Sequence, residues 1–358
     1  MADRARDPHS PAPPPGADPI AFPFAPPAPD ASAVEVAPGV LWLRMPMPMQ
    51  LDHINVYLLD DGDGWFIVDT GLHTADCKAR WETVAASRLA GRPLKGLICT
   101  HFHYDHAGLA SWLMERFGIP LWMTYGEYFT MRALGERLPD PPPDGLVDFH
   151  RRAGMPAERI ARMLAGLRRD PFMPPQPQSF RRLRAGDRMR IGGRTWQIIV
   201  GEGHSPEHAC LYCADDAILI AGDQLLPRIT SNVLVSSVEP EGNPLQLWFD
   251  SLDRLERLAP HTLVLPSHER VFRGLRPRVA ELRAHHRQQF ALLAAALAGR
   301  QRLSAFEAMQ VLFSRPLSPA EDMMALGETV AHLSWLRYAG EIVRVLDEDG
   351  VYRFAATG

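Results

Sequence analysis

The 358-residue sequence lacks the features that mark membrane and secreted proteins. No apolar run approaches the roughly 18 residues that a membrane-spanning helix needs. The first thirty residues are rich in proline and alanine and contain no apolar core of a secretion signal, so we interpret residues 1–33 as a flexible tail. A formal net charge of -4 gives no general reason to expect nucleic acid as a partner. We therefore expect a cytoplasmic protein without a membrane partner.

Cysteine is scarce as well, with four residues at positions 77, 99, 210 and 213. Cys210 and Cys213 are spaced like a redox or zinc pair, but they lie in a strand-like run and no second pair exists. Residues three apart in a strand point to opposite faces, so we predict buried thiols in a reducing compartment. The remaining composition, 46% hydrophobic and 22% charged, is that of a globular chain long enough for one large domain and a smaller one.

The stretch CTHFHYDHAG, residues 99–108, concentrates three histidines and an aspartate directly after an apolar run. In an extended segment His101 and His103 can point to the same side. Asp105 and His106 follow a predicted turn toward the helical stretch 109–117 and can face a second point nearby. Imidazole and carboxylate suit Zn, Fe or Mn, so the cluster predicts half of a two-metal site. A histidine-rich surface loop is the alternative, but a metal site requires further ligands elsewhere.

Three more apolar strands each end in a candidate ligand. Residues 196–200 lead to His204, residues 217–221 lead to Asp223, and residues 262–265 lead to His268. Loops at one edge of a sheet are where sites converge. One histidine after a strand is more often a solvated loop residue, whereas the ordered set predicts a shared site.

These motifs resemble those of the metallo-β-lactamase superfamily. The HxHxDH signature stands at residues 101–106, the later motifs match His204, Asp223 and His268, and the early aspartate of the family matches Asp69 in FIVDTG. The resemblance covers about residues 35–290. It implies an α+β fold, the αββα sandwich, with two divalent metal ions at one edge, Zn²⁺ first and Fe or Mn as alternatives. It also implies that one ion is held by His101, His103 and His204, the other by Asp105, His106 and His268, with Asp223 bridging and Asp69 orienting the ligand loop.

Two motifs depart from the pattern of close relatives. The third reads Gly-Glu-Gly-His at residues 201–204, and the fifth has Ser267 and Glu269 on either side of His268 where glycines are common. All seven ligand types are present, so the extra carboxylates affect only the expected metal preference and local charge.

The remaining chain divides into a catalytic domain at 34–295 and an appendage. Alternating residues from 37 to 71 predict antiparallel strands with a turn at 61–64, and residues 75–89 predict a helix. We interpret residues 135–194 as a basic helical insertion, because residues 150–194 carry twelve arginines against three acids. It is either a solvated helical face or an anion-binding cap over the metals.

Residues 302–358 predict three helices and a hairpin, which resembles the winged-helix-like C-terminal domain of some superfamily members. The third predicted helix offers only Arg337, and the segment has five arginines against eight acids. A DNA-reading version needs lysine and arginine there, so we predict a packing or homo-dimerisation module.

A methionine-rich segment is the last candidate element of the site. Pro46 and Pro48 disfavour a central strand, which predicts a loop carrying Met45, Met47 and Met49. The loop is either an apolar wall for an acyl group or packed on its own core.

The implied function is that of a binuclear metal-dependent hydrolase, resembling the glyoxalase II and lactonase-like branch. A metal-bridging hydroxide would attack a thioester, ester or lactone carbonyl, and Asp105 would be the catalytic residue that orients it. The expected partner is a small-molecule acyl substrate on an anionic carrier. The alternatives are a phosphodiesterase or endoribonuclease, a mononuclear-iron persulfide-dioxygenase-like oxidoreductase, and a binding protein with a relic site.

Overall fold

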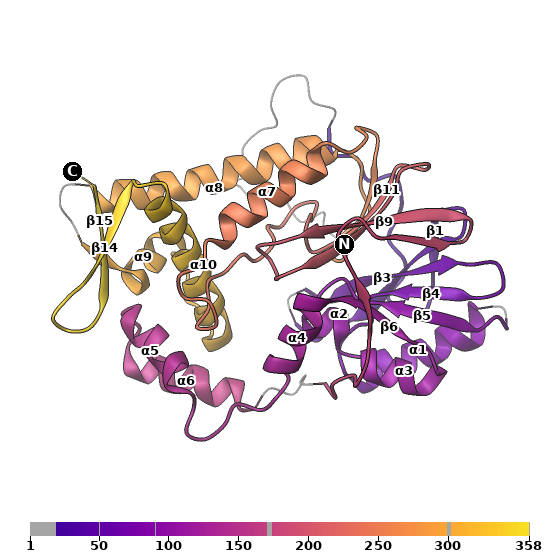
Figure 1. Cartoon of the computed structure of the whole chain (residues 1–358), viewed down its shortest axis with the longest axis horizontal. Helices are drawn as coiled ribbons and strands as arrows, with labels where there is room; N and C mark the ends of the chain where they lie inside the picture. Colours follow the sequence, from indigo (N-terminus) through magenta and orange to yellow (C-terminus); the bar gives the residue numbers. More distant parts are fainter. Residues whose placement is uncertain (1–18, 50, 90, 170–173, 299–301, 358) are drawn as a thin grey trace.

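The computed structural model describes residues 19–49, 51–89, 91–169, 174–298 and 302–357. Two mixed β-sheets pack face to face, helices cover their outer faces, and a small C-terminal domain follows (Figure 1). This arrangement is the αββα sandwich that the sequence predicted.

The seven-stranded sheet runs in the order β1 to β7. Its first four strands are antiparallel and its last four are parallel. The strands are β1 (Val34–Ala37), β2 (Val40–Pro46), β3 (His53–Asp60), β4 (Trp65–Val68), β5 (Leu94–Ile98), β6 (Leu121–Thr124) and β7 (Arg181–Leu183). Residues 61–64 join β3 to β4, so the predicted hairpin is confirmed.

The five-stranded sheet runs in the order β12-β11-β10-β9-β8, with only β11 and β12 parallel. The strands are β8 (Arg188–Ile191), β9 (Arg194–Gly201), β10 (His208–Cys213), β11 (Ile218–Gly222) and β12 (Leu263–Pro266). Three of them are the predicted ligand-bearing strands.

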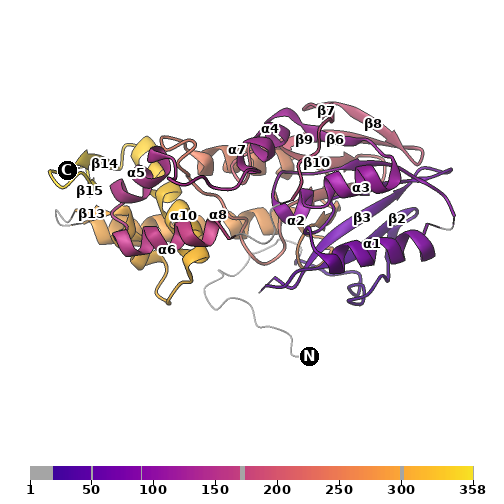
Figure 2. The ribbon, with the colours of Figure 1, turned by 90° about the horizontal axis from the view of Figure 1, so that it is seen from below.

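Helices α1 (Ala75–Ser87) and α3 (Ala110–Phe117) cover the first sheet, while α7 (Pro244–Glu256) and α8 (Leu275–Leu297) cover the second (Figure 2). One apolar core fills the space between the sheets, a second lies under α1 and α3, and a third lies under α7 and α8. Short helices α2 (Tyr104–Ala107) and α4 (Tyr125–Leu134) follow β5 and β6. They therefore stand at the edge where the parallel strands end.

The C-terminal domain contains β13 (Leu303–Ser304), α9 (Ala305–Leu312), α10 (Pro319–Tyr338), β14 (Ile342–Leu346) and β15 (Tyr352–Ala356). The second and third predicted helices are one helix, α10. Gly327 lies inside α10 against Leu234 and Val235, where a Cβ atom would come within 2.9 Å of either residue. The glycine permits close packing and does not end the helix.

The C-terminal domain shares the third core with the sandwich. Leu326 and Leu333 of α10 belong to the same buried cluster as Trp248 of α7 and Leu282 of α8. Figure 1 shows α8 running from the sandwich to this domain. The two parts are therefore held together by a continuous apolar interior.

The prediction of a helical insertion over residues 135–194 is wrong for its last part. Helices α5 (Asp144–Arg152) and α6 (Ala157–Leu167) are present, but residues 181–183 and 188–191 are strands of the two sheets. Both views place α5 and α6 beside the C-terminal domain (Figures 1 and 2). Arg159 pairs with Asp322 of α10 at 2.8 Å, so part of the arginine excess serves this packing.

The prediction of a methionine loop is wrong for Met45 and confirmed for Met47 and Met49, which follow β2 outside any strand. Met45 lies inside β2, and Met45 and Met47 are buried in the core under α1 and α3, while Met49 is exposed. Strand β2 accommodates Pro46 because β1 pairs only with residues 40–42, so the proline lies where β2 has no partner on that side.

The prediction of a flexible tail over residues 1–33 is wrong for the part that the structure describes. Residues 1–18 lie outside the described residues, but Ala21 exchanges backbone hydrogen bonds with Arg273 at 3.1 and 2.8 Å. Residues 19–33 are therefore attached to the sandwich.

The four cysteines are buried, and Cys210 and Cys213 lie on opposite faces of β10 in different cores, as predicted. No helix in the described ranges is long and apolar enough to cross a membrane.

Candidate metal centre

The seven predicted ligands gather at one edge of the sandwich. His101 and His103 follow β5, Asp105 and His106 lie on α2, and the other three follow β9, β11 and β12, in that order. They form two groups, His101, His103, His204 and Asp223 in one and Asp105, His106 and His268 in the other, with ligand atoms of each group within 4.8 Å of one another.

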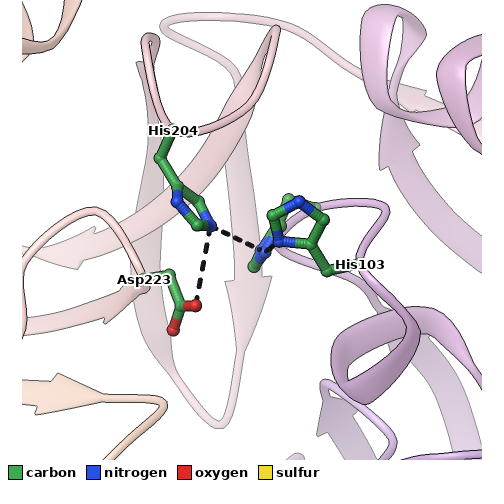
Figure 3. Close-up of side chains that lie close together, drawn as sticks. His103, His204 and Asp223 are labelled. Atoms are coloured by element: carbon green, nitrogen blue, oxygen red, sulfur yellow. Dashed lines mark hydrogen bonds and ion pairs between the residues drawn. The ribbon is translucent and has the colours of Figure 1, made fainter. Parts of the chain in front are cut away.

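In the first group, three imidazoles surround a common point and Asp223 lies beside them. His101 Nε2 lies 2.8 Å from His103 Nδ1 and 3.1 Å from His204 Nε2. Figure 3 shows His103 and His204 facing each other, with the carboxylate of Asp223 below them. Asp223 Oδ2 is 3.5 Å from His204 Nε2.

The second group shares Asp223 with the first. Asp223 Oδ2 is 3.5 Å from His106 Nε2, and its Oδ1 is 3.4 Å from His268 Nε2. Asp105 Oδ2 lies 3.6 Å from His106 Nε2 and 3.3 Å from His268 Nε2. One carboxylate thus stands between the two groups, in the position that a bridging ligand requires.

The hydrogen bonds of the other ring nitrogens fix the histidines in the form that binds a metal. His106 Nδ1 donates to Asp69 at 2.8 Å, His204 Nδ1 to the carbonyl of Asn232 at 2.8 Å, and His268 Nδ1 to the carbonyl of His53 at 3.2 Å. A proton on Nδ1 leaves Nε2 free to coordinate. Each of these Nε2 atoms points into the cluster.

The donor set fits divalent metal ions. His106 Nε2 and Asp223 Oδ1 are buried and have no hydrogen-bond partner within the described structure. An unpartnered buried acceptor is costly, and a cation between the two groups would satisfy both atoms. Nitrogen and carboxylate oxygen donors without thiolates are those of Zn, Fe or Mn sites.

The electrostatics differ between the two groups. Burial and the other imidazoles lower the pKa of His103 to about 3, and burial lowers the pKa of His204. Burial opposes protonation of His268, but Asp223 and Asp105 outweigh it and raise the pKa of His268 to about 10. The first group is therefore neutral imidazole, whereas the second lies in a field that favours positive charge.

Asp69 lies behind the second group, as the sequence suggested. Its carboxylate accepts the Thr100 N–H at 2.8 Å and the Thr100 hydroxyl at 2.9 Å, in addition to His106. Asp69 is buried and has a positive φ of 62°, a strained conformation for a residue other than glycine. The strand end is therefore shaped to aim this carboxylate at His106.

Two further residues at the site escaped the sequence analysis. His208 of β10 is buried, and its Nε2 accepts the Asp223 N–H at 3.1 Å. Glu127 of α4 is buried beside the loops of the first group, where burial raises the pKa of its carboxyl to about 7. His208 was missed because it lies four residues after His204, which already accounted for the third motif. No sequence pattern around Glu127 indicates a role at the site.

The two unusual carboxylates do not join either group of ligands in the described residues. Glu202 pairs with Arg254 at 3.4 Å. Glu269 is partly buried, its pKa is raised by burial, and its carbonyl accepts a hydrogen bond from Arg44 at 2.7 Å. Their effect on the cluster is therefore indirect.

Comparison with known proteins agrees with this geometry. Residues 49–268 match the model of the metallo-beta-lactamase superfamily, and residues 291–357 match that of a metallo-beta-lactamase-like C-terminal domain. A beta-lactamase domain protein from Burkholderia ambifaria is 42% identical, with a TM-score of 0.88 over 94% of this chain and 98% of that chain. A metallo-beta-lactamase family protein from Thermus thermophilus is 29% identical, with a TM-score of 0.75 over 90% and 100%.

Two curated relatives are also similar. The probable metallo-hydrolase YqjP of Bacillus subtilis (strain 168) is 23% identical over 87% of this chain and 97% of its own length. A hydroxyacylglutathione hydrolase of Fuscovulum blasticum is 31% identical over 26% of this chain and 34% of its own length.

Proposed function

This chain belongs to the metallo-beta-lactamase superfamily, and we propose that it is a binuclear metal-dependent hydrolase acting on a thioester, ester or lactone carbonyl. The observation that carries the proposal is the position of Asp223, whose carboxylate stands within 3.5 Å of histidines from both groups. The Bacillus relative, which matches over nearly its whole length, supports hydrolysis. The hydroxyacylglutathione hydrolases match over a shorter stretch and support an acyl substrate.

Two divalent ions bound here would polarise the substrate carbonyl and lower the pKa of bound water. We propose that Asp105 orients that water. It is the most exposed of the carboxylates at the cluster, and His106 and His268 outweigh its burial and lower its pKa to about 2. Asp105 is therefore ionised at neutral pH and can accept a hydrogen bond or a proton from the attacking water.

A complete second group of ligands favours the two-metal hydrolase over the mononuclear-iron alternative. Asp105, His106 and His268 converge as closely as the first group does, and Asp223 faces both. A site for one ion would not need these four side chains to converge. We propose Zn²⁺ first, with Fe and Mn as the alternatives.

An aromatic and basic surface on α4 and β7 supports the proposal of an anionic carrier on the substrate. Tyr125 and Phe129 of α4 are 48% and 47% exposed, and their ring centroids lie 4.4 Å apart. The Arg182 guanidinium stacks over Tyr125 at 4.7 Å. Glu127 on the opposite, buried side of α4 contacts both loops of the first group, so one helix carries the aromatic pair and the support of those loops.

The arginines of β7 do not act together. Successive strand residues point to opposite faces, and Arg181 stacks on Trp122 while Arg182 stacks on Tyr125. Arg182 therefore belongs to the aromatic surface and Arg181 does not. We propose that Arg182, Tyr125 and Phe129 contact an anionic carrier such as coenzyme A or glutathione, by stacking and by charge.

The test is a substrate panel of coenzyme A and glutathione thioesters, lactones, phosphodiesters and RNA, together with two arginine variants. Arg182→Ala should raise KM for a charged thioester several-fold and leave kcat nearly unchanged, because uniform binding is lost. A small neutral ester should be unaffected. Arg181→Ala is the matched control on the opposite face and should change neither substrate.

A phosphodiesterase or endoribonuclease is the second candidate, because stacked aromatic and arginine side chains also suit bases and phosphates. The acidic balance of the C-terminal domain opposes it, since nucleic-acid binding depends on lysine and arginine. If the chain hydrolyses only phosphodiesters or RNA in the substrate panel, the proposal of a carbonyl substrate is wrong and this second candidate takes its place. We propose that the C-terminal domain, winged-helix-like in our interpretation, serves packing or dimerisation.

A further inference from the structure

Two buried carboxylates outside the ligand set stand behind the metal centre. Asp69 holds His106 of the second group directly. Glu127 has no contact with a ligand side chain in the described structure, but it holds the backbone on which the first group is mounted. Asp69 therefore acts directly on the second group, and Glu127 acts on the backbone of the first.

Glu127 joins two loops that are far apart in the sequence. Its Oε2 accepts the Phe102 N–H at 3.0 Å, and its Oε1 accepts the Ser205 hydroxyl at 2.6 Å and the Glu207 N–H at 2.7 Å. Phe102 lies between His101 and His103, and Ser205 directly follows His204. One side chain thus fixes the distance between the two loops that carry the three histidines.

Bonds in the opposite direction strengthen this connection. The carboxylate of Glu207 accepts the Gly126 N–H at 2.7 Å, and its carbonyl accepts the Thr124 hydroxyl at 2.7 Å. The start of α4 and the loop after His204 are therefore bound to each other at both Glu127 and Glu207. The loop cannot move away from α4 without breaking bonds at both residues.

We propose that Glu127 is the positioning residue of the first metal group and that its loss weakens the first ion selectively. This inference rests on the proposed metal centre. Coordination requires the three imidazoles to converge within tenths of an ångström, and partners that orient ligands typically contribute roughly 10–100-fold to metal affinity. Asp69 supports the second group through a direct bond to His106, so each group depends most strongly on a different buried carboxylate.

Glutamine is the discriminating substitution because it keeps the shape of Glu127 and removes one acceptor. If its oxygen faces Ser205 and Glu207, its NH₂ group meets the Phe102 N–H. If its oxygen faces Phe102, its NH₂ group meets the Glu207 N–H. In either orientation the NH₂ group of the glutamine faces a backbone N–H, so two hydrogen-bond donors meet, and the backbone N–H cannot turn away.

The experiment measures Zn²⁺ affinity by chelator competition in two single-site backgrounds. His268→Ala removes a ligand of the second group and reports the first, and His204→Ala reports the second. Glu127→Gln should weaken Zn²⁺ at least roughly 10-fold in the His268→Ala background. In the His204→Ala background the change should stay within about 3-fold, a smaller loss than an orienting partner causes.

Glu207→Gln is the matched control, since Glu207 accepts one backbone N–H and a glutamine oxygen can keep that bond. It should leave both affinities nearly unchanged. Ser205→Ala removes one donor to Glu127 and keeps the test available if Glu127→Gln does not fold. It should weaken the first group in the same direction by a smaller factor.

Equal weakening of both groups, or none, would overturn the inference and leave Glu127 with a general structural role. The premise is tested separately by the unmodified chain. If that chain binds fewer than two ions, the proposed metal centre fails. If it binds two and Glu127→Gln has no selective effect, only the role of Glu127 fails.

Discussion

Substituting Asp69 by asparagine tests how the second group of ligands is kept ready for a metal. Asp69 Oδ1 accepts the Thr100 N–H at 2.8 Å, and its Oδ2 accepts His106 Nδ1–H at 2.8 Å and the Thr100 hydroxyl at 2.9 Å. In Asp69→Asn the amide oxygen keeps the backbone bond, and the NH₂ group replaces Oδ2. The Thr100 hydroxyl can turn to accept it, but His106 Nδ1 can do so only by giving up its proton.

The imidazole of His106 would then carry its proton on Nε2, the atom that faces the metal centre. A charge-assisted hydrogen bond of this kind is worth about 1.5–3 kcal/mol. Because each 1.4 kcal/mol corresponds to a factor of ten, the expected loss of affinity in the second group is roughly 10–100-fold. The first group has no direct bond to Asp69 in the described structure and is linked to it only through the Thr100 hydroxyl, 3.1 Å from His101 Nδ1, so its loss of affinity should be smaller.

Chelator competition with Zn²⁺, in the two single-site backgrounds described above, measures the two affinities separately. Asp322→Asn is a control, since Asp322 of the C-terminal domain is also a buried aspartate but pairs with Arg159 of α6. It should leave both affinities unchanged. An Asp69→Asn chain that binds the second ion as tightly as the parent, or that loses both ions equally, would refute the tautomer argument.

The remaining predictions concern stability. Leu333→Ala, in the core shared by the C-terminal domain and the sandwich, should lower the free energy of unfolding by about 2–5 kcal/mol and leave metal content and kcat unchanged. Urea unfolding with metal analysis checks this, and a loss of metal at unchanged stability would contradict it. Burial lowers the pKa of His332 to about 4, so this residue costs stability as pH falls from about 6.5 toward 4, where only the unfolded chain is protonated. In metal-free chains the free energy of unfolding of His332→Gln, relative to that of the parent, should therefore rise by about 2 kcal/mol between pH 7 and pH 5. Burial raises the carboxyl pKa of Glu328 to about 7, which has the opposite effect on stability, but this effect is common to both proteins and cancels in the difference. A difference in the free energy of unfolding between the two proteins that does not change with pH would contradict the lowered pKa of His332.

The ligand-bearing strands could be predicted because each combines two local signals. A short apolar run predicts a buried strand, and a histidine or aspartate directly after it marks the edge, as at Asp223 after β11. Cys210 and Cys213 could be placed on opposite faces for a similar reason, since strand alternation depends only on local geometry.

Other features depend on contacts between distant parts of the chain. Two of the three residues of β7 are exposed arginines and only Leu183 is buried, so the strand shows no alternation of apolar and polar residues. Its pairing with β6 is decided by the edge of the sheet. Pro46 is compatible with β2 only because the pairing of β2 with β1 stops at residue 42 and does not reach Pro46. Glu127 has partners at residues 102, 205 and 207, and no sequence pattern around α4 announces them.

The most direct test of the two-metal centre is the metal content of the purified chain and of Asp223→Ala, by elemental analysis alongside hydrolysis of the thioester panel. The unmodified chain should contain close to two ions. Asp223→Ala should lose much of the metal and the activity together, because one carboxylate faces both groups and its removal leaves the two cations unscreened. One tightly held iron in the unmodified chain, or full metal content and activity in Asp223→Ala, would contradict the account.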